Sequence, residues 1–253
     1  MASWADLRRE AAAWAANGAS AALWLRDDDA VRATPALKAL LAATARHRIP
    51  VALAVVPAAC RDDLVGLAAA YDAQILVHGY AHANHAVRPE RKSEFGGYRS
   101  MNAMVAEAMA GLSRLRALFG AAALPVFVPP WNRADPGLVA RLGDAGYRGY
   151  SALGDPLPAR VAPGLHQANV HVDLIDWRRR TFAGVAATLE RLIAELKARR
   201  SGGSASRAPI GILTHHLVHD TALERFLDRF LAETAAFPGL RWHSAASVFA
   251  PAP

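Results

Sequence analysis

The stretch "LWLRDDDAVRATP", residues 23–35, contains one complete transition from strand to helix. Its apolar run ends at Leu25, three aspartates follow almost at once, and Thr34 then precedes Pro35. A threonine followed by proline is typical of a helix N-cap and the first helical residue. The stretch therefore predicts a buried strand, a charged strand end and a helix, which is the repeating unit of a parallel α/β fold.

The same alternation continues along the 253 residues. Apolar, β-branched runs predict strands at residues 21–27, 49–57, 73–79, 124–130, 147–153, 168–176 and 209–216, with a shorter candidate at 241–245. Helical patterns lie between them at residues 36–47, 61–71, 100–119, 136–145, 181–200 and 221–236. Seven such units favour a distorted (β/α)7-type barrel over an open doubly wound sheet, with an active site at the C-terminal ends of the strands.

The length is that of one α/β barrel, so a single domain over residues 1–253 is expected. An N-terminal helix is predicted within residues 1–20. The Gly- and Ser-rich segment 201–208 reads as a flexible loop inside the domain, since it separates a helix from a strand. The long polar segment 79–99 is a candidate lid over a site.

Composition narrows the functional classes. Hydrophobic residues make up 53% of the chain, which excludes a disordered protein. The net charge is +7, but no basic stripe with interleaved aromatic residues appears, so no nucleic-acid partner is expected. A single cysteine, Cys60, allows neither an internal disulfide nor a thiolate metal cluster. No apolar run reaches the roughly 20 residues of a membrane span, and no signal-peptide pattern begins the chain, so a cytoplasmic protein is expected.

Polar side chains collect where the predicted strands end. Aspartates follow the first strand, and histidines follow the third and the last. These residues are Asp27, Asp28 and Asp29, then His78, His82 and His85, then His215, His216 and His219. Ligands and catalytic groups of parallel α/β folds gather at the carboxyl ends of the strands. Their combined occurrence is typical of a hydrolytic metal site.

Each motif alone has a structural explanation. Three aspartates after a strand often form a solvated turn and helix cap. Histidines spaced by four residues occur on surfaces and in cores, and "VPPW" (128–131) is a common proline-rich turn. "DLIDW" (173–177) can start a helix, and "LTHH" (213–216) can be a strand end with hydrogen-bonded imidazoles. Only their joint presence at several strand ends favours a catalytic site.

The chemistry of these residue types is consistent with one divalent cation. Two neutral imidazoles and one carboxylate leave coordination positions for water and substrate. A second carboxylate beside them can accept the proton of an attacking water. A histidine oriented by an aspartate can protonate the leaving group. A bound cation would also explain why like-charged aspartates stand side by side.

In this arrangement the sequence resembles the polysaccharide deacetylase superfamily, the family 4 carbohydrate esterases, from Leu23 to about Val218. Its first two motifs, TFDDG and HxxxH, are similar to "LRDDD" and "HGYAH" here. The resemblance implies a distorted (β/α) barrel that removes acetyl groups with a zinc-type ion. It implies Asp27 as catalytic base and Asp28, His78 and His82 as metal ligands.

The remaining motifs follow in the family order. "VPPW" resembles RxPY and places Trp131 at the acetyl site. "DLIDW" matches DxxDW, which implies that Asp176 orients the acid and that Trp177 lines the pocket. "LTH" matches LxH, which implies Leu213 as a pocket wall and His215 as general acid.

Two departures from the family pattern bear on the site. Asp29 stands where the family has glycine, so a register shifted by one residue, with Asp28 as base and Asp29 as ligand, is an alternative. Val128 stands where the family has the arginine that pairs with the base. Arg26 or Arg133 is expected to replace that arginine.

The resulting hypothesis is a metal-dependent deacetylase acting on an acetylated sugar or glycan precursor. Zinc is the first choice of metal, with cobalt, nickel or manganese as alternatives. Two other functions stay open, namely hydrolysis of another small C–N amide bond and an inactive carbohydrate-binding or regulatory module of the same fold.

Overall fold

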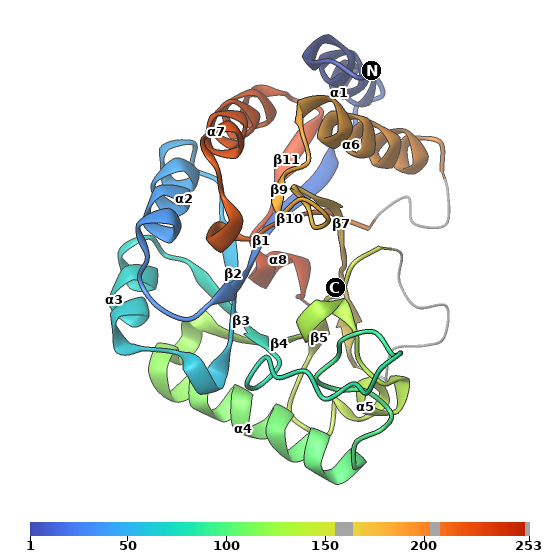
Figure 1. The fold of residues 1–253 in the computed structure, drawn as a ribbon. Helices are drawn as coiled ribbons and strands as arrows, with labels where there is room; N and C mark the ends of the chain where they lie inside the picture. The colour runs from blue at the N-terminus through green and yellow to red at the C-terminus, as the bar shows by residue number, and fades with distance from the viewer. Residues whose placement is uncertain (155–163, 203–207, 251–253) are drawn as a thin grey trace. The chain divides into compact units, whose positions relative to one another are not determined.

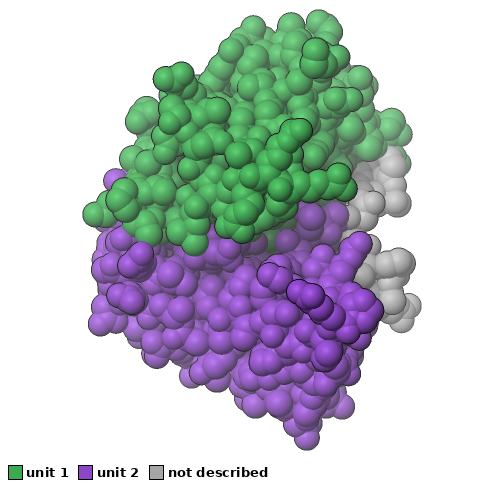
Figure 2. Space-filling view, in the orientation of Figure 1, with its two compact units in different colours: residues 1–27, 34–51, 170–248 green, residues 28–33, 52–169, 249–253 purple. Residues whose placement is uncertain are grey.

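The computed structural model describes residues 1–154, 164–202 and 208–250. They form two compact units, coloured separately in Figure 2. The first unit contains Met1–Asp27, Thr34–Val51 and Val170–Val248, and the second contains Asp28–Ala33, Ala52–Asn169 and the C-terminal segment from Phe249. The chain first crosses from one unit to the other between Asp27 and Asp28, inside the aspartate run.

The first unit is a parallel sheet with helices packed on it (Figure 1). Its strand order is β7-β10-β1-β11. The strands are β1 (Ala21–Ala30), β7 (Val170–Asp173), β10 (Ile210–Thr214) and β11 (Leu240–Trp242), and a two-stranded antiparallel ribbon is formed by β8 (Ile175–Asp176) and β9 (Thr181–Phe182). The helices are α1 (Trp4–Ala16), α2 (Pro35–Arg46), α6 (Val185–Arg200), α7 (Thr221–Ala236) and α8 (Ala245–Val248).

Local sequence signals explain where these helices begin. Ser3 caps α1 in a capping box with Asp6, and Thr34 Oγ1 accepts the Leu37 N–H at 3.1 Å to cap α2, which starts at Pro35. Helices α1 and α6 lie against each other, as do α2 and α7.

The register of the first sheet determines which residues share its carboxyl edge. Asp27 of β1 lies opposite Thr214 of β10, and Leu213 of β10 lies opposite Asp173 of β7. The end of β1 therefore lies beside the start of the histidine segment that follows β10.

The second unit is also a parallel sheet, in the order β2-β3-β4-β5-β6. The strands are β2 (Val51–Val55), β3 (Gln74–His78), β4 (Ala123–Val128), β5 (Gly149–Tyr150) and β6 (His166–Gln167). The helices are α3 (Asp62–Ala70), α4 (Met101–Phe119) and α5 (Pro136–Arg141), with short 3₁₀ turns at Pro57–Ala59, Gly120–Ala122 and Pro130–Asn132. Helix α4 packs on β3 and β4 (Figure 1).

Aromatic rings form the centre of the second unit. Phe127 of β4 contacts Phe95 and Tyr147 edge-on, with ring centroids 5.2 Å and 5.3 Å away. All three side chains are fully buried, and the Tyr147 hydroxyl donates to the Ala108 carbonyl of α4 at 2.7 Å. Burial raises the pKa of Tyr147 well above its usual value. This cluster connects β4 to α4 and to the segment that contains Phe95.

Every strand and helix expected from the sequence has a counterpart in the structure. Helix α6 begins at Val185 rather than at residue 181, because the β8–β9 ribbon occupies residues 175–182. Most of the expected loop 201–208 lies outside the described residues. In the described part of the chain, no helix has the length and apolar character needed to cross a membrane.

Replacing Phe127 with Ala should destabilise the protein by about 3–5 kcal/mol, because the change leaves a cavity between two buried aromatic rings. The free energy of unfolding can be measured by urea titration. Met109→Ala is the control, since Met109 is 50% exposed on α4. Equal losses in the two variants would contradict the importance of this aromatic cluster.

Candidate functional site

A carboxylate and two imidazoles converge in the second unit. Asp29 Oδ1 lies 3.1 Å from His78 Nε2 and 3.3 Å from His82 Nε2. One ligand atom from each residue lies within 4.8 Å of the other two, and among the described residues this is the single group of three such side chains. Carboxylate oxygen and imidazole nitrogen are common ligands of zinc and related cations. The donor set therefore fits a divalent cation.

His78 is held by the backbone of the neighbouring strand. It ends β3 opposite Val128 of β4, and its Nδ1 lies 3.1 Å from the Val128 carbonyl oxygen. A carbonyl can only accept, so Nδ1 carries the proton and donates. In the neutral ring, the Nε2 lone pair then faces Asp29. A metal-binding histidine usually donates its other nitrogen to a carbonyl or carboxylate in this way.

The backbone at the cluster is unusual. Asp29, His82 and Trp131 have φ values of 70°, 55° and 56°, in the left-handed region that non-glycine residues seldom occupy. Aspartate tolerates this region fairly well, whereas for a bulky tryptophan it is a clear outlier. Backbone strain of this kind concentrates at functional sites, where the surrounding structure enforces it.

Trp131 covers one side of the cluster. Its ring centroid is 4.3 Å from that of His82, at an interplanar angle of 52°. His82 keeps 27% of its side chain exposed, while His78 keeps 2%. Burial lowers the pKa of His82, as does His78 nearby, against an opposing contribution from Asp29. The neutral ring that a cation needs is thereby favoured.

Glu94, which the sequence motifs do not single out, supports the loop between the two histidines. Its carboxylate is 1% exposed and accepts the backbone N–H groups of Tyr80 at 3.1 Å and Ala81 at 2.7 Å, with a longer contact from Ala83 at 3.5 Å. Ser93 and Phe95 on either side are also buried. The part of segment 79–99 around Glu94 is thus packed into the unit, where the sequence predicts a lid.

The structure groups Asp29, rather than Asp28, with the two histidines. Side chains of a regular strand alternate between its two faces, and that rule does not determine the direction of a residue with φ of 70°. Asp28 precedes this residue and is 1% exposed. The grouping of Asp29 with His78 and His82 is the one that the shifted register predicts for the metal ligands.

Asp27, the expected base, lies in the first unit and has another partner. Its Oδ2 accepts the His216 backbone N–H at 2.8 Å, and its Oδ1 lies 2.5 Å from His216 Nδ1. Asp27 is fully buried and His216 is 1% exposed. His216 is therefore one partner of this carboxylate, for which Arg26 or Arg133 was expected. The guanidinium of Arg133 donates instead to the Lys92 carbonyl at 2.9 Å.

His215, the expected acid, packs against Trp177. Their ring centroids are 4.5 Å apart at 86°, and His215 is 6% exposed. Trp177 Nε1 in turn donates to Asp173 Oδ2 at 2.7 Å. Leu213 is completely buried in β10, two residues before His215.

Asp176, expected to orient His215, makes its hydrogen bonds elsewhere. Its carboxylate accepts the backbone N–H groups of Arg178 at 3.0 Å and Arg179 at 3.3 Å, and it pairs with the Arg179 guanidinium at 3.7 Å. Among the described residues its side chain makes no hydrogen bond to His215. The cause is the turn between β8 and β9, whose free N–H groups bind the Asp176 carboxylate. Asp173 is the aspartate that contacts Trp177.

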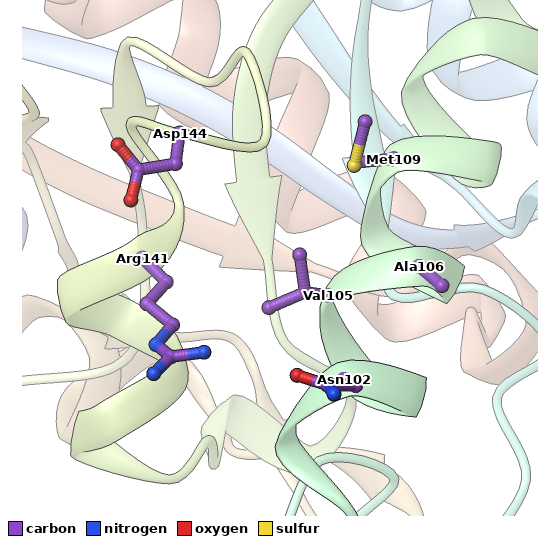
Figure 3. A pocket seen from close by; sticks show the side chains of 6 residues that line it. All are labelled: Asn102, Val105, Ala106, Met109, Arg141 and Asp144. Atoms are coloured by element: carbon purple, nitrogen blue, oxygen red, sulfur yellow. The ribbon is translucent and has the colours of Figure 1, made fainter.

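A surface hollow in the second unit lies away from these residues (Figure 3). Its lining comes from α4 and the end of α5 and consists of Asn102, Val105, Ala106, Met109, Arg141 and Asp144. It contains no histidine and one carboxylate, so it offers no comparable set of metal ligands.

No protein-family model matches the sequence, and no curated protein matches it. Solved structures match almost the whole chain. A polysaccharide deacetylase candidate from Mycobacterium smegmatis has a TM-score of 0.68 at 18% identity, covering 92% of this chain and 90% of that one. Puue allantoinase has a TM-score of 0.65 at 14% identity, covering 91% and 88%. A family 4 acetyl xylan esterase from Clostridium thermocellum, in complex with a cobalt ion, has a TM-score of 0.54 at 14% identity and covers 90% of each chain.

The fold is therefore that of the polysaccharide deacetylases, a distorted barrel of parallel strands and helices, in a sequence that has diverged far from the solved examples. The fold class and the resemblance predicted from the motifs are confirmed. At these identities the similarity establishes the fold and leaves the substrate open.

Replacing Asp29 with Asn should weaken binding of a divalent cation by at least about tenfold, because a charged ligand oxygen is lost. Asp28→Asn, an equally conservative change at the adjacent position, should leave the affinity close to that of the original protein. Titration of metal-free protein with Co²⁺ or Zn²⁺ against a chromophoric chelator gives both values. Loss of binding in the Asp28 variant alone would restore the unshifted register.

The lowered pKa of His82 gives a further prediction for the metal-free protein. Its ring should titrate below the usual value of about 6.5, so cation binding should weaken as the pH falls through that lower range. Because Asp29 opposes the shift, Asp29→Asn should lower the pKa further. NMR of the imidazole C–H signals, assigned with His82→Ala, measures both. A His82 pKa above 6.5 in the metal-free protein would contradict the inferred burial effect.

Proposed function

We propose that this chain is a metal-dependent hydrolase that removes an acetyl group from an acetylated sugar or glycan precursor. The observation that carries the proposal is the convergence of Asp29, His78 and His82 in a polysaccharide deacetylase fold. These three residues would hold one divalent cation, with zinc as the first choice. When bound, such a cation supplies polarisation of the acyl carbonyl and acidification of water.

The chain's own residues take roles that follow the shifted register. Asp28, next to the ligand Asp29, is the general base that accepts a proton from water. Asp28 is 1% exposed and directly precedes Asp29 in the chain. Trp131, whose ring lies against that of His82, is assigned to the acetyl group, as the resemblance implies.

His215 is the proposed general acid that protonates the leaving amine or alcohol. Trp177 packs edge-on against its ring and is itself held by Asp173, so Asp173 is proposed as the aspartate that positions the acid. Leu213 and Trp177 form pocket walls, as the resemblance implies. Asp176 has a structural role in this proposal, since its carboxylate accepts N–H groups of the turn that follows Trp177.

A second candidate is hydrolysis of a C–N bond in a small amide. Puue allantoinase matches the fold with a TM-score of 0.65, close to the 0.68 found with the polysaccharide deacetylase candidate, so the fold is compatible with either substrate class. The absence of the family arginine at position 128 also separates this chain from the polysaccharide enzymes. The two candidates share the metal centre and differ in the leaving group.

The discriminating assay uses metal-free protein reloaded with Zn²⁺ or Co²⁺. Acetate release from N- and O-acetylated oligosaccharides is compared with hydrolysis of allantoin and small linear amides. Acetate release that depends on the added cation supports the deacetylase, and turnover of amides alone supports the second candidate. Binding of oligosaccharides without turnover of any of these substrates would overturn both and indicate an inactive module.

His215→Ala should lower kcat on the active substrate by roughly 10²–10⁴ while leaving the bound metal in place, because only proton donation is lost. His243→Ala is the matched control, on the segment after β11, and should keep full activity. Inductively coupled plasma analysis reports metal content beside the kinetics. Loss of metal from the His215 variant would show that this histidine is a ligand and not the acid.

A further inference from the structure

The loop between the two metal-site histidines begins with a glycine that leaves room for Glu94. Gly79 follows His78 directly and has φ of 60°. A Cβ at this position would lie 2.2 Å from Glu94 Oε2 and 2.6 Å from Pro130 Cδ, far inside contact distance. The chain can therefore pass over the Glu94 carboxylate only without a side chain here.

Backbone N–H groups of this loop point at one carboxylate. Tyr80 donates to Glu94 Oε2 at 3.1 Å, and Ala81 donates to Oε1 at 2.7 Å. Ala83, just after His82, lies 3.5 Å from Oε1. Successive N–H groups that converge in this way form a concave anion site. Here the anion is the carboxylate of Glu94. It contacts the N–H groups of the residues on both sides of His82.

Glu94 is itself held in place from the other side. Its carbonyl oxygen accepts from the Arg99 guanidinium at 3.1 Å, and Arg99 also forms a two-pronged ion pair with Glu107 of α4, at 2.8 Å and 2.6 Å. Phe95, the next residue, is buried against Phe127. Glu94 is thus anchored to α4 through Arg99 and to β4 through Phe95. Its carboxylate in turn holds the loop that contains His82, whose backbone is left-handed.

Given the proposed function, we propose that Glu94 is the positioning residue of the metal centre, fixing His82 so that its Nε2 faces Asp29 and His78. His78 has support from the Val128 carbonyl of the neighbouring strand, whereas the backbone hydrogen bond of the His82 ring is to its own residue, within the same loop. The direction of the His82 ring then depends on the backbone of its loop. Glu94 acts through that backbone and does not touch the cation.

The test compares Glu94→Gln with Glu90→Gln. Both changes remove one negative charge, but Glu90 is exposed on the same segment and accepts no loop N–H group. The glutamine side chain has only one acceptor oxygen. Its NH2 group is a donor and cannot accept from the N–H groups of the loop. Glu94→Gln should weaken Co²⁺ or Zn²⁺ binding about 10–100-fold and alter the Co²⁺ absorption spectrum, while Glu90→Gln should change neither.

A double-mutant cycle with His82→Ala tests the route of the effect. If Glu94 acts through His82, Glu94→Gln should add little to the affinity already lost in His82→Ala. Fully additive losses of affinity would overturn the proposed role of Glu94. The same holds if Glu94→Gln binds the cation as tightly as the original protein. If the original protein binds no cation at all, the proposed metal centre fails first, and the role of Glu94 fails with it.

Gly79→Ala gives an independent variant in case Glu94→Gln does not fold. It keeps every charge and displaces the Glu94 carboxylate through the added methyl group. It should reproduce the loss of cation affinity, with thermal unfolding and circular dichroism reporting a folded protein. A folded Gly79→Ala protein with the original affinity would likewise overturn the proposal.

Discussion

Adjacent carboxylates repel one another, so three in a row need compensating partners, and this constraint governs the site. Asp27 is fully buried and bonded twice by His216, once through its backbone N–H and once through its ring. Asp29 faces His78 and His82. Two members of the run thus contact histidines from different strand ends, which offsets much of the cost of placing like charges side by side. The third carboxylate, Asp28, is 1% exposed and is the general base in the proposed function.

A regular strand could not distribute the aspartates in this way. Alternation would send Asp27 and Asp29 to one face and Asp28 to the other. The left-handed backbone at Asp29, with φ of 70°, ends that alternation at the residue where a new direction is needed. His82 and Trp131 have the same kind of backbone, and their rings contact each other at an interplanar angle of 52°. The cluster therefore contains backbone strain at three residues. The hydrogen bonds from the loop to Glu94 help to hold the strained backbone of His82 in place.

The sequence contained most of the fold. Apolar periodicity located the strands and helices, because burial of one face leaves its period in the residue types. The sequence also located the histidine pair, because the spacing His-x-x-x-His directly follows a predicted strand. The sequence could not show which way each aspartate side chain points. Asp28 and Asp29 are the same residue type, and the backbone φ of Asp29 distinguishes them in the structure.

The partners of the site were hidden for a related reason. Asp176 and Asp173 both precede Trp177, and a motif alone cannot tell which of them hydrogen-bonds to a turn and which to the indole. Glu94 lies 12 residues beyond His82 in an exposed-looking polar segment, "RKSEFGG". Its contacts are with backbone N–H groups, which every non-proline residue possesses and which therefore leave no trace in the residue types.

The same reasoning accounts for the valine at position 128. Strand β4 contributes its backbone carbonyl to His78 there, and any residue in the strand could supply that oxygen. Support for His78 is thus independent of the side chain at position 128, and a valine there is compatible with it. In this chain the buried Asp27 has His216 as a partner, which begins the short 3₁₀ turn (His216–Val218) directly after His215. The segment after β10 thus provides one histidine that bonds to Asp27 and, next to it, His215, which is the acid in the proposed function.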